Sequence, residues 1–165
     1  MILLAALLIL RMGMSEDRET ENASINQETE SVWPDQKQTE PELKKVPEEE
    51  LKDKLVDPIL AYYPGTAGSS LKRAVAAAKV LSFAAEYGAC DVSAVPDLLT
   101  TEEERTRFSE NLVTIFDLLE ETEADFDSLS GLYEDAGVYE QMSELAADAD
   151  AWNSLHLLVT SLKSA

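Results

Sequence analysis

The hydrophobic pattern of this 165-residue chain divides it into three zones. Nine consecutive apolar residues, Ile2 to Leu10, are followed by a polar stretch that extends to about Pro47. From Glu48 onward, large apolar residues recur every three or four positions, which places them on one face of a helix. We therefore expect an apolar N-terminal segment (1–14), a polar linker (15–47) and a helical domain (48–165).

The linker has the composition of a disordered segment. It is rich in Glu, Gln, Thr, Asn and Ser, contains three prolines and has almost no large apolar residues. Such a segment cannot bury enough apolar surface to offset the entropy that folding removes. We expect it to form a disordered acidic tail ahead of the domain.

The first helix of the domain is predicted to begin at Glu48. Three acidic residues directly after Pro47 favour a helix N-terminus, where the helix dipole stabilises negative charge. Pro58 interrupts this pattern and should kink or split the helix, with Asp57 capping the second piece. Pro64-Gly65 should end the helix. The residues that define its apolar face are Leu51, Leu55, Ile59 and Tyr62.

The segment from Ser69 to Tyr87 predicts a second helix that lies at the centre of the domain. Its apolar and alanine residues surround almost the whole helix, and only four residues are charged. A helix that is apolar on nearly every side is a buried one. Its alanines should let neighbouring helices approach closely.

Three further helices are predicted in the second half of the domain. The third is capped by Thr100 or Thr101, each followed by Glu three positions later as in a capping box. The fourth covers about 124–136 and stops at Gly137. The last runs from about 138 to 163, and its apolar positions keep the spacing of a packed bundle seam: Val138, Met142, Leu145, Ala149, Trp152, Leu155, Val159 and Leu162.

These helices define the expected fold class. No segment shows the sustained alternation of a strand, and no hairpin turn of the Asn-Gly or Asp-Gly type occurs. We predict an all-α domain, a four- to five-helix bundle with a long C-terminal helix, preceded by the disordered acidic tail.

The apolar run at the N-terminus indicates where the protein acts. It is too short to span a bilayer, which requires about 20 apolar residues, but it fits the core of a secretory signal, which needs about 7–15. No basic residue precedes the run, no cleavage site follows it, and no cysteine near it could accept a lipid. Three explanations are compatible with this pattern: a longer basic signal of which only part is present, a true start at Met12 or Met14, or a hydrophobic tail that packs or binds weakly. We expect an extracytoplasmic protein that contacts the membrane only through this segment, with a cytoplasmic location as the alternative if translation starts at Met12 or Met14.

Net charge narrows the class of partner. The chain carries a formal charge of −20, which disfavours binding to nucleic acid because that binding requires Lys and Arg to neutralise phosphates. The negative charge is concentrated in 102–150, which contains sixteen Asp and Glu residues and only two basic residues, both Arg. Residues 51–101 have no net charge. Solubility is the simplest explanation of this asymmetry. The alternative is that the negative electrostatic field attracts a partner with a basic surface and speeds its association.

No motif for catalysis or cofactor binding occurs in the chain. The one cysteine, Cys90, excludes a disulfide framework and a cysteine-rich zinc site, and nothing in the sequence places the one histidine, His156, beside it. The acidic run around Asp125 lacks the glycine that an EF-hand needs at the sixth position. We therefore predict a protein that is not an enzyme and has no metal or cofactor.

One turn has the chemistry of an anion site. Small and hydroxyl residues from Gly65 lead into the N-terminus of the central helix, where free backbone N–H groups favour anions. A tight connection capped by Ser69 or Ser70 is the structural alternative, and the turn lacks the Gly-Lys-Ser/Thr of a P-loop. The candidate ligand-binding residues are Gly68, Ser69, Ser70, Lys72 and Arg73.

Aromatic residues suggest a second candidate site. Tyr62, Tyr63 and Trp152 could line a pocket, and helical spacing makes Trp152 a neighbour of His156. Packing in the core is the alternative role for each of them.

These observations favour an exported or membrane-tethered acidic helical domain that acts as a protein-interaction module. A cytoplasmic acidic regulatory or docking protein is the first alternative, and a small anion-binding domain that uses the turn at 65–73 is the second. The sequence specifies neither the partner nor the oligomeric state.

Overall fold

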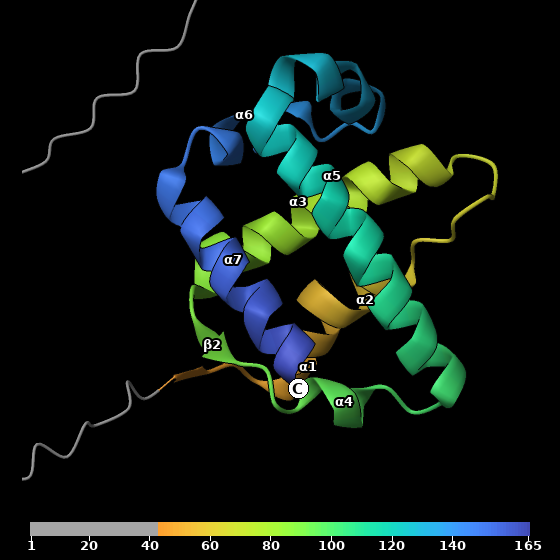
Figure 1. Ribbon diagram of the computed structural model, residues 1–165, viewed down its shortest axis with the longest axis vertical. Helices are drawn as coiled ribbons and strands as arrows, with labels where there is room; N and C mark the ends of the chain where they lie inside the picture. The colour runs from red at the N-terminus through yellow and green to blue at the C-terminus, as the bar shows by residue number, and fades with distance from the viewer. Residues whose placement is uncertain (1–42) are drawn as a thin grey trace, which may run out of the picture. The chain divides into compact units, whose positions relative to one another are not determined.

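The structure, a computed structural model, describes residues 43–165, which form a predominantly helical unit (Figure 1). The all-α prediction and the long helix at the C-terminus are confirmed. The apolar segment 1–14 and most of the linker predicted at 15–47 lie outside the described residues. The helical elements are α1 (Glu48–Leu51), the π-helical segment η1 (Lys52–Val56), α2 (Asp57–Leu60), α3 (Ser69–Tyr87), α4 (Val95–Leu98), α5 (Glu102–Asp135), α6 (Tyr139–Ala146) and α7 (Ala149–Ser164).

The first helical stretch continues through Pro58 and widens into η1 just before it. The Asp57 N–H bonds the Lys52 carbonyl, five residues back. Because proline has no N–H and its ring collides with the carbonyl four residues earlier, a regular α-turn cannot pass this point. The expected disturbance at Pro58 is therefore present as a π-turn. Asp57 has helical backbone angles and its side chain makes no cap, so the predicted capping role is wrong.

Helix α3 lies at the centre of the unit, as the sequence predicts. It packs against α5 and α7, which cross it in Figure 1, and it also contacts α2, α6 and η1. Five of its alanines are buried, and these small side chains allow close packing: Ala74, Ala76, Ala77, Ala78 and Ala84.

Helix α5 contains both the third and the fourth predicted helix. Its N-terminus has the capping box expected at Thr101: the Glu104 N–H donates to Thr101 Oγ1 (3.1 Å) and the Thr101 N–H donates to Glu104 Oε2 (3.1 Å). The predicted break near residue 124 is a kink at Asp125, whose backbone is non-helical (φ −156°, ψ 69°). The Asp125 carboxylate accepts the Ser128 N–H (3.2 Å) and so caps the second segment.

The single helix predicted over 138–163 is divided in two between α6 and α7. Asp148 has extended backbone angles, and its carboxylate accepts the N–H groups of Asp150 (2.9 Å) and Ala151 (3.3 Å). The indole of Trp152 donates to the Ala146 carbonyl (3.2 Å), which satisfies an acceptor at the end of α6. Capping at Asp148 therefore competes successfully with continuation of the helix, although the apolar spacing continues across the break.

A short parallel strand pair lies at the start of the described chain. Strand β1 (Lys44–Lys45) pairs with β2 (Cys90–Asp91), with Lys44 opposite Cys90. Two residues are too few to show the alternation by which a strand is recognised in a sequence. Val46, within the segment assigned to the linker, is buried, so packed structure begins before Glu48.

One buried polar side chain connects α2 to α5. Asn111 is 1% exposed, and its Nδ2 donates to the carbonyl oxygens of Ile59 (2.7 Å) and Tyr62 (2.7 Å). These carbonyls lie where α2 ends, and acceptors at a helix end lack the regular donors of the helix interior. Asn111 thus caps α2 from a helix that is about 50 residues away in the sequence.

Candidate functional site

The second half of the domain contains a long acidic segment that has no Lys or Arg. Between Arg107 and Lys163 the sequence contains thirteen Asp and Glu residues and no Lys or Arg. Within the described residues, none of these carboxylates lies within ion-pair distance of a Lys or Arg. Glu123 is 3.5 Å from His156 Nε2, a contact that is ionic only when the imidazole is protonated. Among residues 43–165, these carboxylates therefore form a group of acidic side chains without Lys or Arg partners.

A cavity of about 480 Å³ lies in this segment at the turn between α5 and α6. Its lining includes two exposed carboxylates and one exposed tyrosine ring. The residues that line it are Glu134, Gly137, Val138, Tyr139, Glu140 and Gln141. Carboxylates beside an aromatic face form a suitable receptor for a Lys or Arg side chain, which gains both an ion pair and a cation–π contact.

The turn that forms this cavity is built by a C-terminal helix cap. The Gly137 N–H donates to the Glu134 carbonyl (2.9 Å), and the Val138 N–H donates to the Tyr133 carbonyl (3.0 Å). This is the Schellman pattern, which requires a left-handed residue after the helix, and Gly137 supplies it with φ of 71°. The glycine that stops the helix in the sequence therefore also shapes the cavity.

Tyr139, which lines the cavity, belongs to a series of aromatic contacts. Tyr139 packs against Phe126, with ring centroids 5.8 Å apart, and Phe126 stacks on the fully buried Tyr133 at 6.0 Å. The Tyr133 hydroxyl bonds Thr122 Oγ1 (2.6 Å), which in turn donates to the Leu118 carbonyl (2.7 Å). Burial raises the pKa of the Tyr133 hydroxyl above its ordinary value. These contacts hold the exposed Tyr139 ring on a rigid base.

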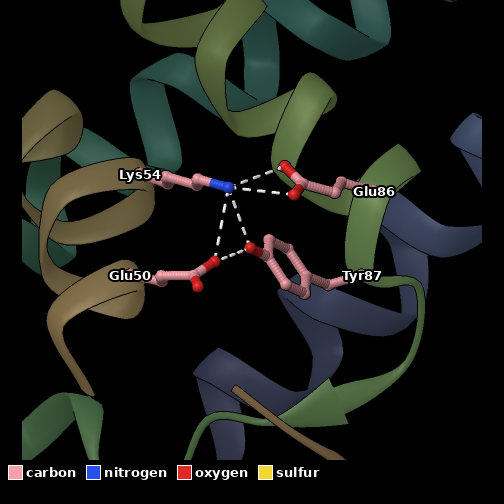
Figure 2. Close-up of polar contacts among 4 residues, drawn as sticks. All are labelled: Glu50, Lys54, Glu86 and Tyr87. Carbon is pink, nitrogen blue, oxygen red and sulfur yellow. Dashed lines mark hydrogen bonds and ion pairs between the residues drawn. The ribbon is translucent and has the colours of Figure 1, made fainter. Parts of the chain in front are cut away.

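A second cluster of polar groups joins η1 to the end of α3 (Figure 2). Lys54 Nζ lies 2.9 Å from Glu86 Oε1, 2.9 Å from Tyr87 Oη and 3.3 Å from Glu50 Oε2. The Tyr87 hydroxyl donates to Glu50. The hydrogen bond to Glu86 is the main cause that raises the pKa of Lys54. Each charge in this cluster has a partner, so the cluster is best explained as a connection between the two helices.

Two smaller cavities lie along α3, each of about 210 Å³, and both include Lys79. The first is lined by Asp53, Lys54, Lys79, Ser82, Phe83 and Glu86. The second is lined by Pro58, Ala61, Lys72, Val75, Ala76 and Lys79. The second therefore has lysines but no carboxylate in its lining.

The candidate anion turn is exposed, and only one of its residues lines a described cavity. Gly68 adopts the left-handed region (φ 71°) as the residue before α3, and neither serine caps the helix through its side chain. The Ser69 N–H already donates to the Thr66 carbonyl (3.0 Å). Ser70 is exposed and Arg73 is partly buried, whereas Lys72 lines the second α3 cavity.

The candidate pocket aromatics have separate environments. Tyr62 is 7% exposed, and its carbonyl is capped by Asn111. Tyr63 is 42% exposed, and its ring lies 4.8 Å from the Arg107 guanidinium. Trp152 is buried at the start of α7, and none of the three lines a cavity described above. Sequence reasoning did not find Tyr139 or Lys79, although Tyr139 lies two residues after the Gly137 stop signal.

Two further features of the described residues concern metal ligands and membrane spans. Between Leu43 and Ala165, no three His, Cys, Asp or Glu side chains gather closely enough to bind a metal ion. Within the same range, no helix has the length and apolar content that a membrane span requires.

Comparisons with protein-family models, with curated proteins and with solved structures find no significant match to this chain.

Proposed function

We propose that this chain is a non-enzymatic, four- to five-helix interaction domain that binds a basic segment of another protein at the turn between α5 and α6. The observation that carries the proposal is the cavity at this turn, whose lining includes Glu134, Glu140 and the exposed ring of Tyr139. A Lys or Arg side chain could enter the cavity and contact both carboxylates and the ring.

The surrounding charge supports the same class of partner. Carboxylates of α5, α6 and α7 without Lys or Arg partners create a negative potential, which attracts a basic segment from solution and repels acidic ones. The cavity adds local selectivity, because only a side chain that reaches it gains the contact with Tyr139. Diffuse attraction would then speed encounter, while the cavity would determine where the segment binds.

The proposal is tested with a fluorescent peptide of about 12 residues rich in Lys and Arg, titrated with the full chain and followed by anisotropy. We expect saturable binding that weakens as salt rises, because exposed charges are screened over a Debye length of about 8 Å at physiological salt. E134Q/E140Q should weaken binding about fivefold or more, since two exposed ion pairs and their geometry are lost. The Tyr139→Leu variant keeps an apolar side chain but removes the aromatic face, and it should also weaken binding.

The matched control removes the same charge elsewhere. Glu48 and Glu49 are exposed at the start of α1, which lies at the opposite end of the unit from α6 in Figure 1. E48Q/E49Q should therefore change affinity by less than twofold. If both double variants weaken binding equally, the cavity is not the binding site and only net charge attracts the peptide. Absence of binding at low salt would refute the proposal entirely.

We also propose that the domain acts outside the cytoplasm, released from or tethered by the apolar segment 1–14. Support comes only from the sequence of Ile2–Leu10, which matches the apolar core of a signal. The decisive measurement is the intact mass and the location of the protein expressed from its native locus. A shortened chain outside the cytoplasm is the expected result. A full-length chain in the cytosol, or one that starts at Met12 or Met14, would instead favour a cytoplasmic docking protein.

A further inference from the structure

The second α3 cavity has a shape and chemistry that the acidic segment does not use. It lies between the end of α2 and α3, and its floor is apolar because Pro58 and Ala76 are buried and Val75 is partly buried. The alanine at position 76 leaves room at the floor that a larger side chain would fill. The groove is therefore open, apolar at its base and limited in volume to about 210 Å³.

The rim of this groove carries the charge opposite to that of the domain as a whole. Lys72 and Lys79 are exposed, lie seven residues apart on α3 and so share one face of the helix. Within the described residues, neither ammonium lies within ion-pair distance of a carboxylate. Lys72 Nζ lies 5.9 Å from the centre of the Tyr63 ring, a weak contact that leaves it free to bind an anion. In a chain of charge −20, two lysines without partners beside an apolar floor are an unusual arrangement.

The adjoining cavity limits where an anion can sit. It shares Lys79 but also contains Asp53 and Glu86, and Glu86 already binds Lys54. An anionic group is repelled by these carboxylates and attracted by the two lysines, so its charge should lie between Lys72 and Lys79. The apolar part of the ligand should then point toward Pro58 and Ala76.

We propose that this groove binds a small monocarboxylate with an aliphatic or aromatic body. The cavity volume of about 210 Å³ restricts the ligand to a small molecule. Ligands of this size bind in the millimolar to micromolar range at best. The inference is independent of the protein-interaction proposal, because the two sites share no residue.

The test uses hexanoate, which combines a carboxylate with a body of suitable size. The full chain, labelled with ¹⁵N, is titrated at constant ionic strength, and amide chemical shifts are followed by NMR. We expect saturable shifts at Val75, Ala76 and Lys79. Acetate supplies the charge without the body, and 1-hexanol supplies the body without the charge, so each should bind about tenfold more weakly than hexanoate.

Variants separate the groove from general effects. Lys72→Gln and Lys79→Gln should each weaken hexanoate binding about threefold or more and leave hexanol binding unchanged. Lys52→Gln removes the same charge from an exposed lysine of η1 that lines neither cavity, and it should leave hexanoate binding unchanged. Circular dichroism checks that each variant is folded. Equal affinity for hexanoate and hexanol, equal loss in all three variants, or no shift at 20 mM hexanoate would each overturn the proposal.

Discussion

The most informative perturbation of the fold is the substitution of Asn111 by leucine. The two side chains have similar size, but leucine cannot donate to the carbonyls of Ile59 and Tyr62, which Asn111 binds at 2.7 Å each. At 1% exposure, no water can readily replace these donors. The substitution therefore isolates the cost of removing the Asn111 donor from two acceptors at the end of α2.

The magnitude follows from these two bonds. A buried polar group that loses its partner costs about 1–3 kcal/mol, so two groups would cost about 2–6 kcal/mol. The Ile59 carbonyl keeps a long bond from the Tyr62 N–H (3.4 Å), which reduces its share. We therefore expect the free energy of unfolding to fall by about 2–4 kcal/mol, or the melting temperature to fall by about 10 °C or more.

The assay is urea denaturation followed by circular dichroism at 222 nm. The midpoint should fall while the slope m stays constant, because the substitution leaves the surface exposed on unfolding nearly unchanged. Asn153→Leu makes the same chemical change at an exposed position of α7 and should alter stability by less than about 0.5 kcal/mol. A loss below 1 kcal/mol for Asn111→Leu, with m unchanged, would refute the capping role.

A second substitution at the same position adds a dependence on pH. Asn111→Asp replaces the amide nitrogen, which donates both hydrogen bonds, with a carboxyl oxygen. This oxygen then lies against the two carbonyl oxygens of Ile59 and Tyr62. The folded state then favours the neutral acid, so the pKa of the introduced carboxyl should rise above its unfolded value of about 3.9. Stability lost through this charge is largest at neutral pH and is recovered as pH falls toward 4. A gap between the Asp and Leu variants that stays constant from pH 7 to pH 4 would contradict this reasoning.

Three further predictions concern the rest of the domain. Tyr133→Phe should cost about 1 kcal/mol through the lost bond to the threonine hydroxyl, with Tyr139→Phe near zero as its control, by urea denaturation at pH 7. Because burial raises the pKa of Tyr133 in the folded state, stability present below pH 10 should be lost as pH rises through the raised value, and the loss should be smaller in Tyr133→Phe. Thr101→Ala should cost about 1 kcal/mol by removing the α5 cap, whereas Thr106→Ala at an exposed position of the same helix should not. Met142→Ala should cost about 2–5 kcal/mol, because this side chain is fully buried in α6, and a loss below 1 kcal/mol would mean that α6 is not packed on the core.

Local signals in the sequence were sufficient for much of the helical architecture. The apolar periodicity identifies α3 as the buried centre, and the capping box at Thr101 marks the start of α5. Glycine at 137 marks a helix stop, because few other residues adopt the left-handed angle required there. These features depend on residues within about one helical turn of each other. They can therefore be predicted from the local sequence alone.

The candidate sites were predicted less completely. The acidic half follows directly from composition, but composition does not bring Tyr139, Glu134 and Glu140 together in the lining of one cavity. Lys72 was identified for its position near a helix N-terminus, whereas the structure places it on the rim of a groove with Lys79. Tyr62 and Trp152 were grouped because both are aromatic, yet both are buried and neither lines one of the cavities described above.

By itself, therefore, the sequence determined the helical class, the central helix, the main capping signals and the charge of each half. Only the tertiary structure decided which distant groups meet: Asn111 with the end of α2, Lys44 with Cys90, and Lys54 with Glu86. The tertiary structure also decided the helix break at Asp148, because the indole of Trp152 stabilises this break by donating to the Ala146 carbonyl at the end of α6. The physical reason is that helix formation depends on neighbours three or four residues apart, whereas grooves and buried hydrogen bonds depend on surfaces that come together only when the chain folds.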